Sequence, residues 1–201
     1  MDIKFRKKCH ILVVVDVQND FVTGSLGSIQ AQEIVPNVME KINSFDGEYI
    51  IFTQDTHGDD YLFTKEGEKL PVRHCIKGSD GWRLIPEIEE YLKRNLMSRE
   101  KTVMVVGKPT FGSVYHDNET KSLIDCVSEI REANGNLGLE IEVIGVCTGI
   151  CVVSNVLLLK AHFYDVADIV VDAKCCACVS SETHEAALTT METCQINVVN
   201  R

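Results

Sequence analysis

Cys151, at a predicted strand-to-helix turn, is the clearest candidate for a reactive side chain in this sequence. The β-branched run 139–144 before it is typical of a buried strand, and the apolar segment 151–161 is typical of a buried helix. We expect Thr148 to cap this helix and Gly149 to allow a tight turn. The positive end of the helix dipole would favour a thiolate at Cys151. The alternative is a buried thiol that packs as a small hydrophobic side chain.

Charged side chains stand where three other apolar runs end. They are Asp16, the pair Asp55 and His57, and Lys108. Ligands of open α/β sheets bind beyond the carboxyl ends of the strands. Taken singly, Asp16 could cap a loop, the pair Asp55 and His57 could fix a loop, and Lys108 could be a solvated surface lysine. Taken with Cys151, they favour one site that holds a base, metal-ligand types, a cation and a thiol, because a thiol of pKa about 8.5 needs such help to react.

The elements that must position these residues alternate along the chain. The predicted strands are 11–17, 48–53, 101–107, 139–144, 166–173 and 196–199. The predicted helices are 36–45, 85–96, 119–133, 151–161 and 182–194, with loops at 18–28 and 54–82. Strands that are apolar throughout and alternate with helices indicate a mostly parallel sheet covered on both faces. We predict one doubly wound, Rossmann-like α/β domain over residues 1–201, with the last strand at an edge.

Composition narrows the possible partners. The 201 residues are 45% hydrophobic and 25% charged, and the formal net charge is −10. This negative charge argues against binding to nucleic acid or to an anionic membrane surface. No run reaches the roughly 18 apolar residues of a membrane span, and no signal cleavage site follows the charged N-terminus. We expect a cytoplasmic homo-oligomer that binds neither nucleic acid nor membrane.

The cysteines fit a reducing compartment. There are nine, an odd number, whereas a secreted disulfide scaffold is normally shorter and evenly paired. Cys175, Cys176 and Cys178 form a cluster that only Cys194 follows. A structural zinc site usually has a second cysteine pair, so thiols at the end of a strand are the favoured interpretation and zinc is the alternative.

Five motifs resemble those of the isochorismatase-like cysteine hydrolases, and among them those of the nicotinamidases. They are DVQNDF with GSL (16–21 and 24–26), TQDTH (53–57), RHCIKGSDGW (73–82), GKPTFGS (107–113) and GVCTGICV (145–152). Each motif is short, but the five occur in the family's order and span nearly the whole chain. The resemblance implies the isochorismatase-like fold and a catalytic set of Asp16, Lys108 and Cys151.

This resemblance implies a mechanism of amide hydrolysis. Asp16 would take the proton of the Cys151 thiol and pass it to the leaving amine, while Lys108 stabilises the charged forms. A cis peptide between Val146 and Cys147 would direct the backbone N–H groups of Cys147 and Cys151 at the oxyanion. The favoured reaction converts nicotinamide and water into nicotinate and ammonia through a thioester on Cys151.

The resemblance also implies a metal site. Asp55, His57 and His74 would bind a divalent ion that holds the pyridine nitrogen of the substrate, and Glu66 resembles a further carboxylate ligand found in some nicotinamidases. One or two carboxylates with two imidazoles suit zinc, which we expect first, or iron or manganese. The alternative is that Asp55 and His57 only fix the loop.

Substrate contacts are less specific in the sequence. Phe21, Phe111 and Gln18 are the candidates, since aromatic rings stack on flat substrates in apolar pockets. Phe111 could equally belong to the core, and Gln18 could be an exposed loop amide. The sequence departs from the nicotinamidase pattern at Thr56, where tryptophan is usual, and at Gly149, where aspartate is frequent.

The sequence is therefore compatible with three hypotheses about the function. The first is nicotinamide hydrolysis, and the second is hydrolysis of another small amide or a carbamoyl compound by the same residues. The third is a non-catalytic module that binds a metal or senses thiols. An isochorismate-type vinyl ether hydrolase is disfavoured, because that activity does not use a cysteine nucleophile.

Overall fold

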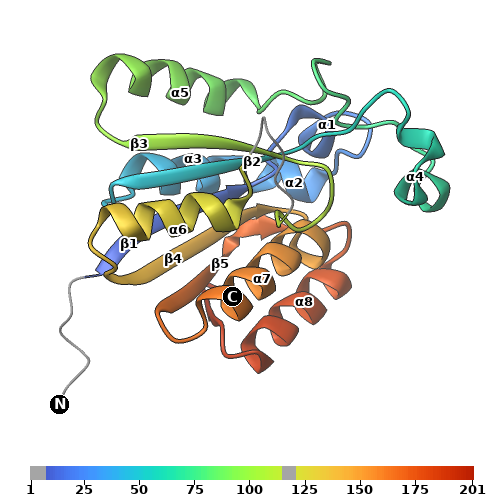
Figure 1. The fold of residues 1–201 in the computed structure, drawn as a ribbon. Coiled ribbons are helices and arrows are strands. Elements are labelled where there is room, and N and C mark those ends of the chain that lie inside the picture. The colour runs from blue at the N-terminus through green and yellow to red at the C-terminus, as the bar shows by residue number, and fades with distance from the viewer. Residues whose placement is uncertain (1–7, 115–120) are drawn as a thin grey trace.

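A six-stranded parallel sheet organises the chain in the computed structural model, which describes residues 8–114 and 121–201 (Figure 1). The strands are β1 (Lys8–Val15), β2 (Tyr49–Asp55), β3 (Thr102–Lys108), β4 (Gly138–Val146), β5 (Ala167–Ala177) and β6 (Asn197–Val199). Their order across the sheet is β3-β2-β1-β4-β5-β6, and each neighbouring pair is parallel. The order reverses between β1 and β4, which is where such folds place their ligands.

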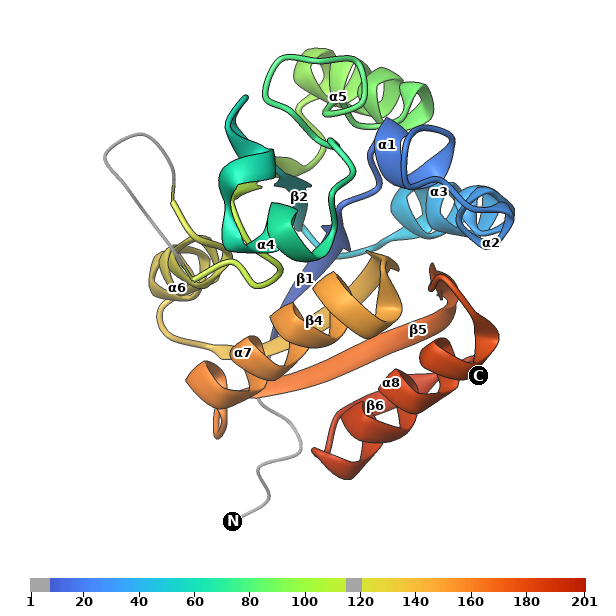
Figure 2. The same cartoon turned by 90° about the vertical axis from the view of Figure 1, so that its right-hand side faces the viewer.

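Helices cover both faces of this sheet. They are α1 (Asn19–Val22), α2 (Ile29–Glu33), α3 (Val35–Ser44), α4 (Lys65–Lys69), α5 (Pro86–Ser98), α6 (Leu123–Ala133), α7 (Val153–Phe163) and α8 (Ser181–Thr193), with a 3-10 turn η2 (Tyr61–Phe63) and a π-helical turn η3 (Thr148–Val152). In the view of Figure 1, α6, α7 and α8 lie in front of the sheet, and α2 and α3 lie behind it. Figure 2 shows the same layers from the side. No helix in the described part of the chain is long and apolar enough to cross a membrane.

The continuous apolar runs of the sequence reflect this double cover. Along β1, Ile11 and Val13 pack against the layer of α6, α7 and α8. Leu12 and Val14 point the other way and pack against α1, α2, α3 and α5. Because alternate side chains of a strand face opposite sides, every position of a doubly covered strand must be apolar. The predicted doubly wound parallel sheet is confirmed, as is the edge position of the last strand.

Short helices interrupt the two segments predicted as loops. Helix α1 lies within the segment 18–28, and the turn η2 and helix α4 lie within the segment 54–82. Helix α2 begins directly after the segment 18–28. They have at most five residues each, which is too short for an apolar repeat to show. Side chains cap two of them, since Ser28 and Thr64 accept hydrogen bonds from the backbone N–H groups of Ala31 and Gly67. The helix predicted over 119–133 begins at Leu123, and its first two predicted residues lie outside the described ranges.

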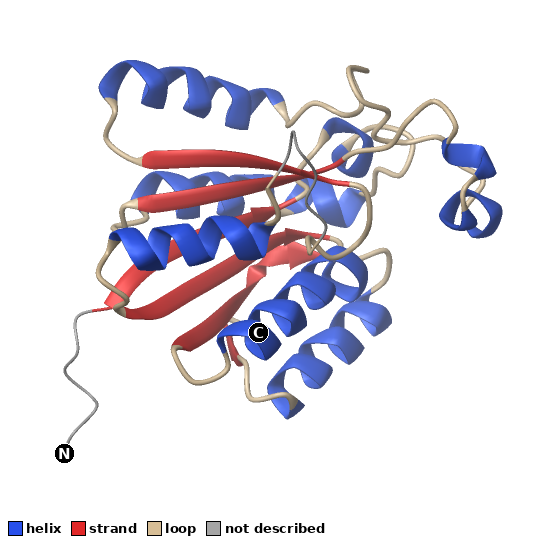
Figure 3. Cartoon of the chain, in the orientation of Figure 1, coloured by secondary structure: helices blue, strands red, loops and turns tan. Residues whose placement is uncertain are grey.

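The segment 56–85 extends beyond the carboxyl ends of the strands, where Figure 3 shows it mostly as loop. An isolated bridge between Gln18 and Leu84 attaches it to the body of the protein, and a second bridge, between His57 and Ile76, joins two parts of the segment itself. This placement brings the residues of the TQDTH and RHCIKGSDGW motifs to the edge of the sheet where β1 and β4 end.

A glycine allows β1 and β4 to approach at that edge. Gly145 has a φ of 124°, and a Cβ atom there would lie 2.1 Å from the carbonyl oxygen of Val15. Only glycine accepts both this backbone conformation and this proximity. Asp16 follows directly with a φ of 51°, a left-handed conformation that is uncommon for aspartate and is found at functional sites.

Candidate active site

Three strand ends bring Asp16, Lys108 and Cys151 together. Asp16 directly follows β1, Lys108 is the last residue of β3, and Cys151 lies in η3 after β4. The ammonium nitrogen of Lys108 lies 2.7 Å from Asp16 Oδ2 and 3.6 Å from Cys151 Sγ. All three residues are buried. A cation is thus held between a carboxylate and a thiol in a place sheltered from water.

Burial dominates the electrostatics of these three groups. It raises the pKa of Cys151 well above the usual value, and the positive charge of Lys108 offsets only part of this effect. It also raises the pKa of Asp16, again against the opposing charge of Lys108. For Lys108, burial acts to lower the pKa, but Asp16, Cys151 and Asp55 outweigh it and the pKa is raised. At Cys151, burial therefore opposes the thiolate, while the charge of Lys108 favours it.

The prediction that Thr148 caps the helix that carries Cys151 is wrong. Cys147 occupies the N-cap position of η3 and makes no side-chain capping bond. Thr148 is instead the first residue of the turn, and its hydroxyl lies 2.9 Å from His184 Nδ1 on α8. The peptide bond between Val146 and Cys147 is cis, as the resemblance implied.

Thr53 and Asn155 support the three groups, and neither role was predicted from the sequence. The Thr53 hydroxyl donates to Asp16 Oδ1 at 2.7 Å. Asn155, on α7, donates to the carbonyl oxygens of Cys151 at 2.8 Å and Phe111 at 3.0 Å. Its own oxygen accepts from the Ser113 N–H at 2.9 Å. Asn155 therefore ties the loop after Lys108 to the turn that carries Cys151.

Four side chains beside this group form a candidate metal centre. Asp55, His57, Glu66 and His74 each offer one ligand atom, and these atoms all lie within 4.8 Å of one another. Asp55 Oδ2 lies 2.9 Å from His57 Nε2 and 3.4 Å from His74 Nε2. Glu66 Oε1 lies 3.6 Å and 3.8 Å from the same two nitrogens. Two imidazole nitrogens and two carboxylates are a donor set that fits zinc, iron or manganese.

Neighbouring groups orient these ligands. His74 Nδ1 lies 2.8 Å from the carbonyl oxygen of Val72, an arrangement that leaves Nε2 free to face the centre. Tyr61 is fully buried, and its ring packs against the rings of His57 (4.6 Å) and His74 (4.8 Å). Its hydroxyl donates to the carbonyl oxygen of Leu70 at 3.0 Å. Tyr61 was not among the residues predicted from sequence.

Asp55 links the candidate metal centre to the other three groups. Its second oxygen, Oδ1, lies 3.3 Å from Lys108 Nζ. Burial acts to raise the pKa of Asp55, but Lys108, His57 and His74 outweigh it and hold the pKa well below the ordinary value. An ionised Asp55 can therefore serve both neighbours at once.

The three predicted substrate contacts have different surroundings. Phe21 packs its ring against His74, with 5.5 Å between the ring centres. Gln18 is fully buried. Its side-chain amide donates to the carbonyl oxygen of Asp55 at 2.9 Å and accepts from the backbone N–H of Asp55 at 2.7 Å. It positions Asp55 and is not an exposed loop amide. Phe111 is 41% exposed, so the alternative prediction that it belongs to the core is wrong.

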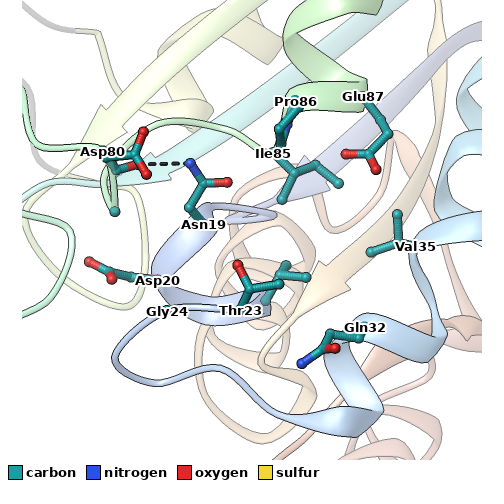
Figure 4. Close-up of a pocket in the computed structure, with 12 residues that line it drawn as sticks. Asn19, Asp20, Thr23, Gly24, Gln32, Val35, Asp80, Ile85, Pro86 and Glu87 are labelled. Atoms are coloured by element: carbon teal, nitrogen blue, oxygen red, sulfur yellow. Dashed lines mark hydrogen bonds between the residues drawn. The ribbon is translucent and has the colours of Figure 1, made fainter.

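Two cavities lie near this edge of the sheet. One of about 290 Å³ borders Phe21 and Cys147 and is lined mostly by apolar side chains, among them Leu26, Leu70, Val146 and Ile150. The other, of about 610 Å³, lies between α1 and the beginning of α5 and includes Asp20, Asp80 and Glu87 (Figure 4). The residues that line this second cavity include none of the candidate catalytic or metal-binding side chains.

The cysteine cluster lies at the end of a strand, as favoured. Cys175 and Cys176 are among the last residues of β5, and Cys178 follows the strand directly. All three are buried.

Comparisons with known proteins bear on the family and the fold of the chain. Residues 10–201 match the isochorismatase domain, and no curated protein matches the sequence. Nicotinamidase PncA from Bacillus subtilis superposes with a TM-score of 0.76 at 24% identity, over 96% of this chain and 99% of that one. Pyrazinamidase from Pyrococcus horikoshii, in complex with zinc, gives 0.70 at 23% identity over 96% and 99%. N-carbamoylsarcosine amidase from Thermoplasma acidophilum gives 0.67 at 23% identity over 96% and 95%.

Proposed function

The chain belongs to the isochorismatase family, and on this premise we propose that it is an amide hydrolase with Cys151 as its nucleophile. The observation that carries the proposal is the buried contact of Lys108 with both Asp16 (2.7 Å) and Cys151 (3.6 Å). A buried lysine between a carboxylate and a thiol costs desolvation energy that a purely structural role does not require. Perturbed groups of this kind concentrate at catalytic sites.

In the proposed mechanism Asp16 takes the proton of the Cys151 thiol as the sulfur attacks the amide carbon. The carbonyl oxygen becomes an oxyanion, and the backbone N–H groups of Cys147 and Cys151 stabilise it. The C–N bond then breaks, and Asp16 passes its proton to the nitrogen, which leaves as ammonia. Water hydrolyses the thioester, releases the carboxylic acid and restores the thiol. Lys108 keeps its charge throughout and stabilises whichever neighbour is anionic.

We propose nicotinamide as the substrate. Asp55, His57, His74 and Glu66 would hold a divalent metal, with zinc as the first choice, and a bound metal would supply a Lewis acid for the lone pair of a ring nitrogen. Phe21 lies against His74 and borders the apolar cavity beside Cys147, where a flat aromatic ring could pack. The nicotinamidases and pyrazinamidases among the similar structures support this choice.

Ammonia release from nicotinamide tests the proposal directly. We expect turnover by metal-supplemented protein and its loss, by more than about 1,000-fold, in Cys151→Ala, because the nucleophile is absent. Cys194→Ala is the matched control, since that cysteine is exposed and lies on no candidate site. Turnover that survives in Cys151→Ala would disprove the mechanism, and no turnover with any amide would disprove the function.

A second candidate substrate is another small amide or a carbamoyl compound. The likeness to N-carbamoylsarcosine amidase supports it, since Asp16, Lys108 and Cys151 could act on any accessible amide. At Thr56 the side chain accepts a hydrogen bond from the Trp82 indole at 2.9 Å, whereas nicotinamidases usually carry a tryptophan at that position. A panel of nicotinamide, aliphatic amides and carbamoyl compounds distinguishes the two candidate substrates. A kcat/KM that is highest for nicotinamide favours nicotinamide, and one that is highest for another compound favours the second candidate.

A further inference from the structure

Two cysteine sulfurs are in contact at the base of the turn that carries Cys151. Cys147 precedes η3, Cys178 follows β5, and their Sγ atoms lie 3.0 Å apart. Both thiols are free. Both line the apolar cavity of about 290 Å³, whose rim includes Val179 with 72% of its surface exposed. A small molecule from solvent can therefore reach the pair.

The surroundings make the two sulfurs unequal. Cys178 Sγ lies 3.1 Å from the Thr183 hydroxyl, besides its contact with Cys147. Burial acts to raise the pKa of Cys178, but hydrogen bonds from Thr183, Cys147 and the N–H groups of Gly149 and Val179 outweigh it, so the pKa is lowered. Burial and the hydrogen bond to Cys178 raise the pKa of Cys147 to about 12. Cys178 is thus the readier nucleophile, and Cys147 is a thiol placed to react with it afterwards.

We propose that Cys147 and Cys178 form a reversible disulfide when the protein meets a hydroperoxide. In the first step the Cys178 thiolate attacks the peroxide O–O bond, which gives a sulfenic acid and releases hydroxide or alkoxide. In the second step the Cys147 sulfur displaces the hydroxyl group of the sulfenic acid and loses its proton, which gives the disulfide and water. Two thiols are oxidised and one peroxide is reduced. Two thiols of a reductant reverse the change.

This bond would act on the proposed oxyanion site. The sulfurs must approach from 3.0 Å to the roughly 2.05 Å of a disulfide, and Cys147 carries one of the two proposed oxyanion N–H groups. The turn already lies close to Cys178, because a Cβ atom at Gly149 would lie 3.1 Å from Cys178 Sγ. The Thr148 contact with His184 also ties this turn to α8. We expect the bond to displace the Cys147 backbone and to inhibit turnover.

Peptide mapping tests the disulfide without reference to any activity. Trypsin places Cys147 and Cys151 on peptide 132–160 and Cys178 on peptide 175–201, so the Cys151→Ser background leaves one cysteine on the first peptide. After a short exposure to hydrogen peroxide and alkylation of the remaining thiols, we expect the two peptides joined, with the loss of two hydrogens. Dithiothreitol should separate them.

Matched variants decide which cysteines are joined. Adding Cys178→Ser or Cys147→Ala to the Cys151→Ser background should abolish the joined peptides, whereas adding Cys194→Ser should leave them. Joined peptides that persist in the Cys178→Ser background would overturn the proposal, and so would their absence from the Cys151→Ser protein. Circular dichroism of each variant confirms that it is folded.

The effect on turnover rests on the proposed function and is measured separately. In protein with Cys151 intact, peroxide should lower ammonia release at least tenfold, and dithiothreitol should restore it. Cys178→Ser should lose this thiol-reversible part, each sample being compared with its own untreated activity. Joined peptides with no change in turnover would overturn the inhibitory role. Joined peptides from a protein without amidase activity would support the disulfide and disprove only the proposed function.

Discussion

Asp16 receives one hydroxyl hydrogen bond that helps to keep it ionised. Thr53 Oγ1 donates to Asp16 Oδ1 at 2.7 Å, and this bond lowers the pKa of Asp16 against the raising effect of burial. In Thr53→Val the pKa of Asp16 should therefore rise, and less of the ionised base should be present at a given acidic pH. We expect the acid limb of the kcat/KM profile to move to higher pH. The buried oxygen left without its donor should also cost about 1–3 kcal/mol of unfolding free energy.

Thr190→Val is the control for this change. Thr190 also donates a side-chain hydrogen bond, at 2.9 Å to the carbonyl oxygen of Ala186, but it lies on the exposed side of α8. Its replacement should leave the acid limb in place. An acid limb that stays in place in Thr53→Val as well would show that Asp16 is not the base whose ionisation limits the rate.

The four candidate metal ligands should differ in importance. His74 is 2% exposed, and its Nε2 lies 3.4 Å from Asp55 Oδ2, whereas Glu66 is only partly buried and stands farther from both histidines. We expect His74→Ala to abolish metal retention through purification. Glu66→Gln should weaken the affinity by about 10–100-fold, because it removes the charge of one ligand while the other three still form a site. Metal analysis and competition with a chelating dye measure both. Equal metal content in His74→Ala and the unchanged protein would contradict this assignment.

A site residue could be predicted from the sequence where its side-chain chemistry and its position along the chain both indicated a role. Asp16, Lys108 and Cys151 stand at the ends of apolar runs, and parallel strands end at a common edge. Thr53 and Asn155 could not be predicted, because their roles depend on distant partners: Asp16 is 37 positions from Thr53, and Ser113 is 42 positions from Asn155. A buried polar side chain reveals its function only once its hydrogen-bond partners are known.

At the scale of elements, Asn155 joins helix α7 to the loop between β3 and α6. It is 1% exposed and makes hydrogen bonds to Ser113, Phe111 and Cys151. Asn155→Leu keeps the size but removes three hydrogen bonds, those to Ser113 and Cys151 being buried, so we expect a loss of about 2–4 kcal/mol in urea unfolding. Hydrogen exchange at the Ser113 amide should accelerate at least tenfold, because that amide loses its acceptor.

Asn134 offers a matched comparison. Its side chain donates at 2.8 Å to the Tyr49 hydroxyl and to the carbonyl oxygen of Ile130, at the other end of α6. Asn134→Leu should lower stability without changing exchange at Ser113. If both variants accelerate that amide equally, the effect is global and Asn155 does not hold the loop locally.

The sequence predicted the elements well where they are long and less well where they are short. The strands and the helices α3, α5, α7 and α8 were placed within a few residues, since each has enough length for an apolar pattern. The π-helical form of η3 and the short helices α1, α2 and α4 were missed. Their shape is set by contacts with other segments, such as the Thr148 contact with His184.

At the scale of the whole molecule, we expect the segment 56–85 to depend on the candidate metal centre. It contributes few buried apolar side chains, chiefly Tyr61, Cys75, Leu84 and Ile85. His57, Glu66 and His74 all belong to it, whereas Asp55 ends β2. A metal bound to these four residues would therefore fasten the segment to the sheet, and the folded state would gain the binding free energy.

Removal of the metal should therefore loosen the segment and destabilise the molecule. At a metal concentration 100 times Kd, binding adds about 2.7 kcal/mol, which is about 5–10 °C in Tm for a chain of this size. We expect a chelator to lower Tm by that amount and to speed tryptic cleavage at the exposed residues Lys65, Lys69 and Lys77. In His74→Ala, which should hold no metal, the chelator should change neither quantity. A chelator shift of equal size in that variant would mean that metal acts elsewhere on the protein.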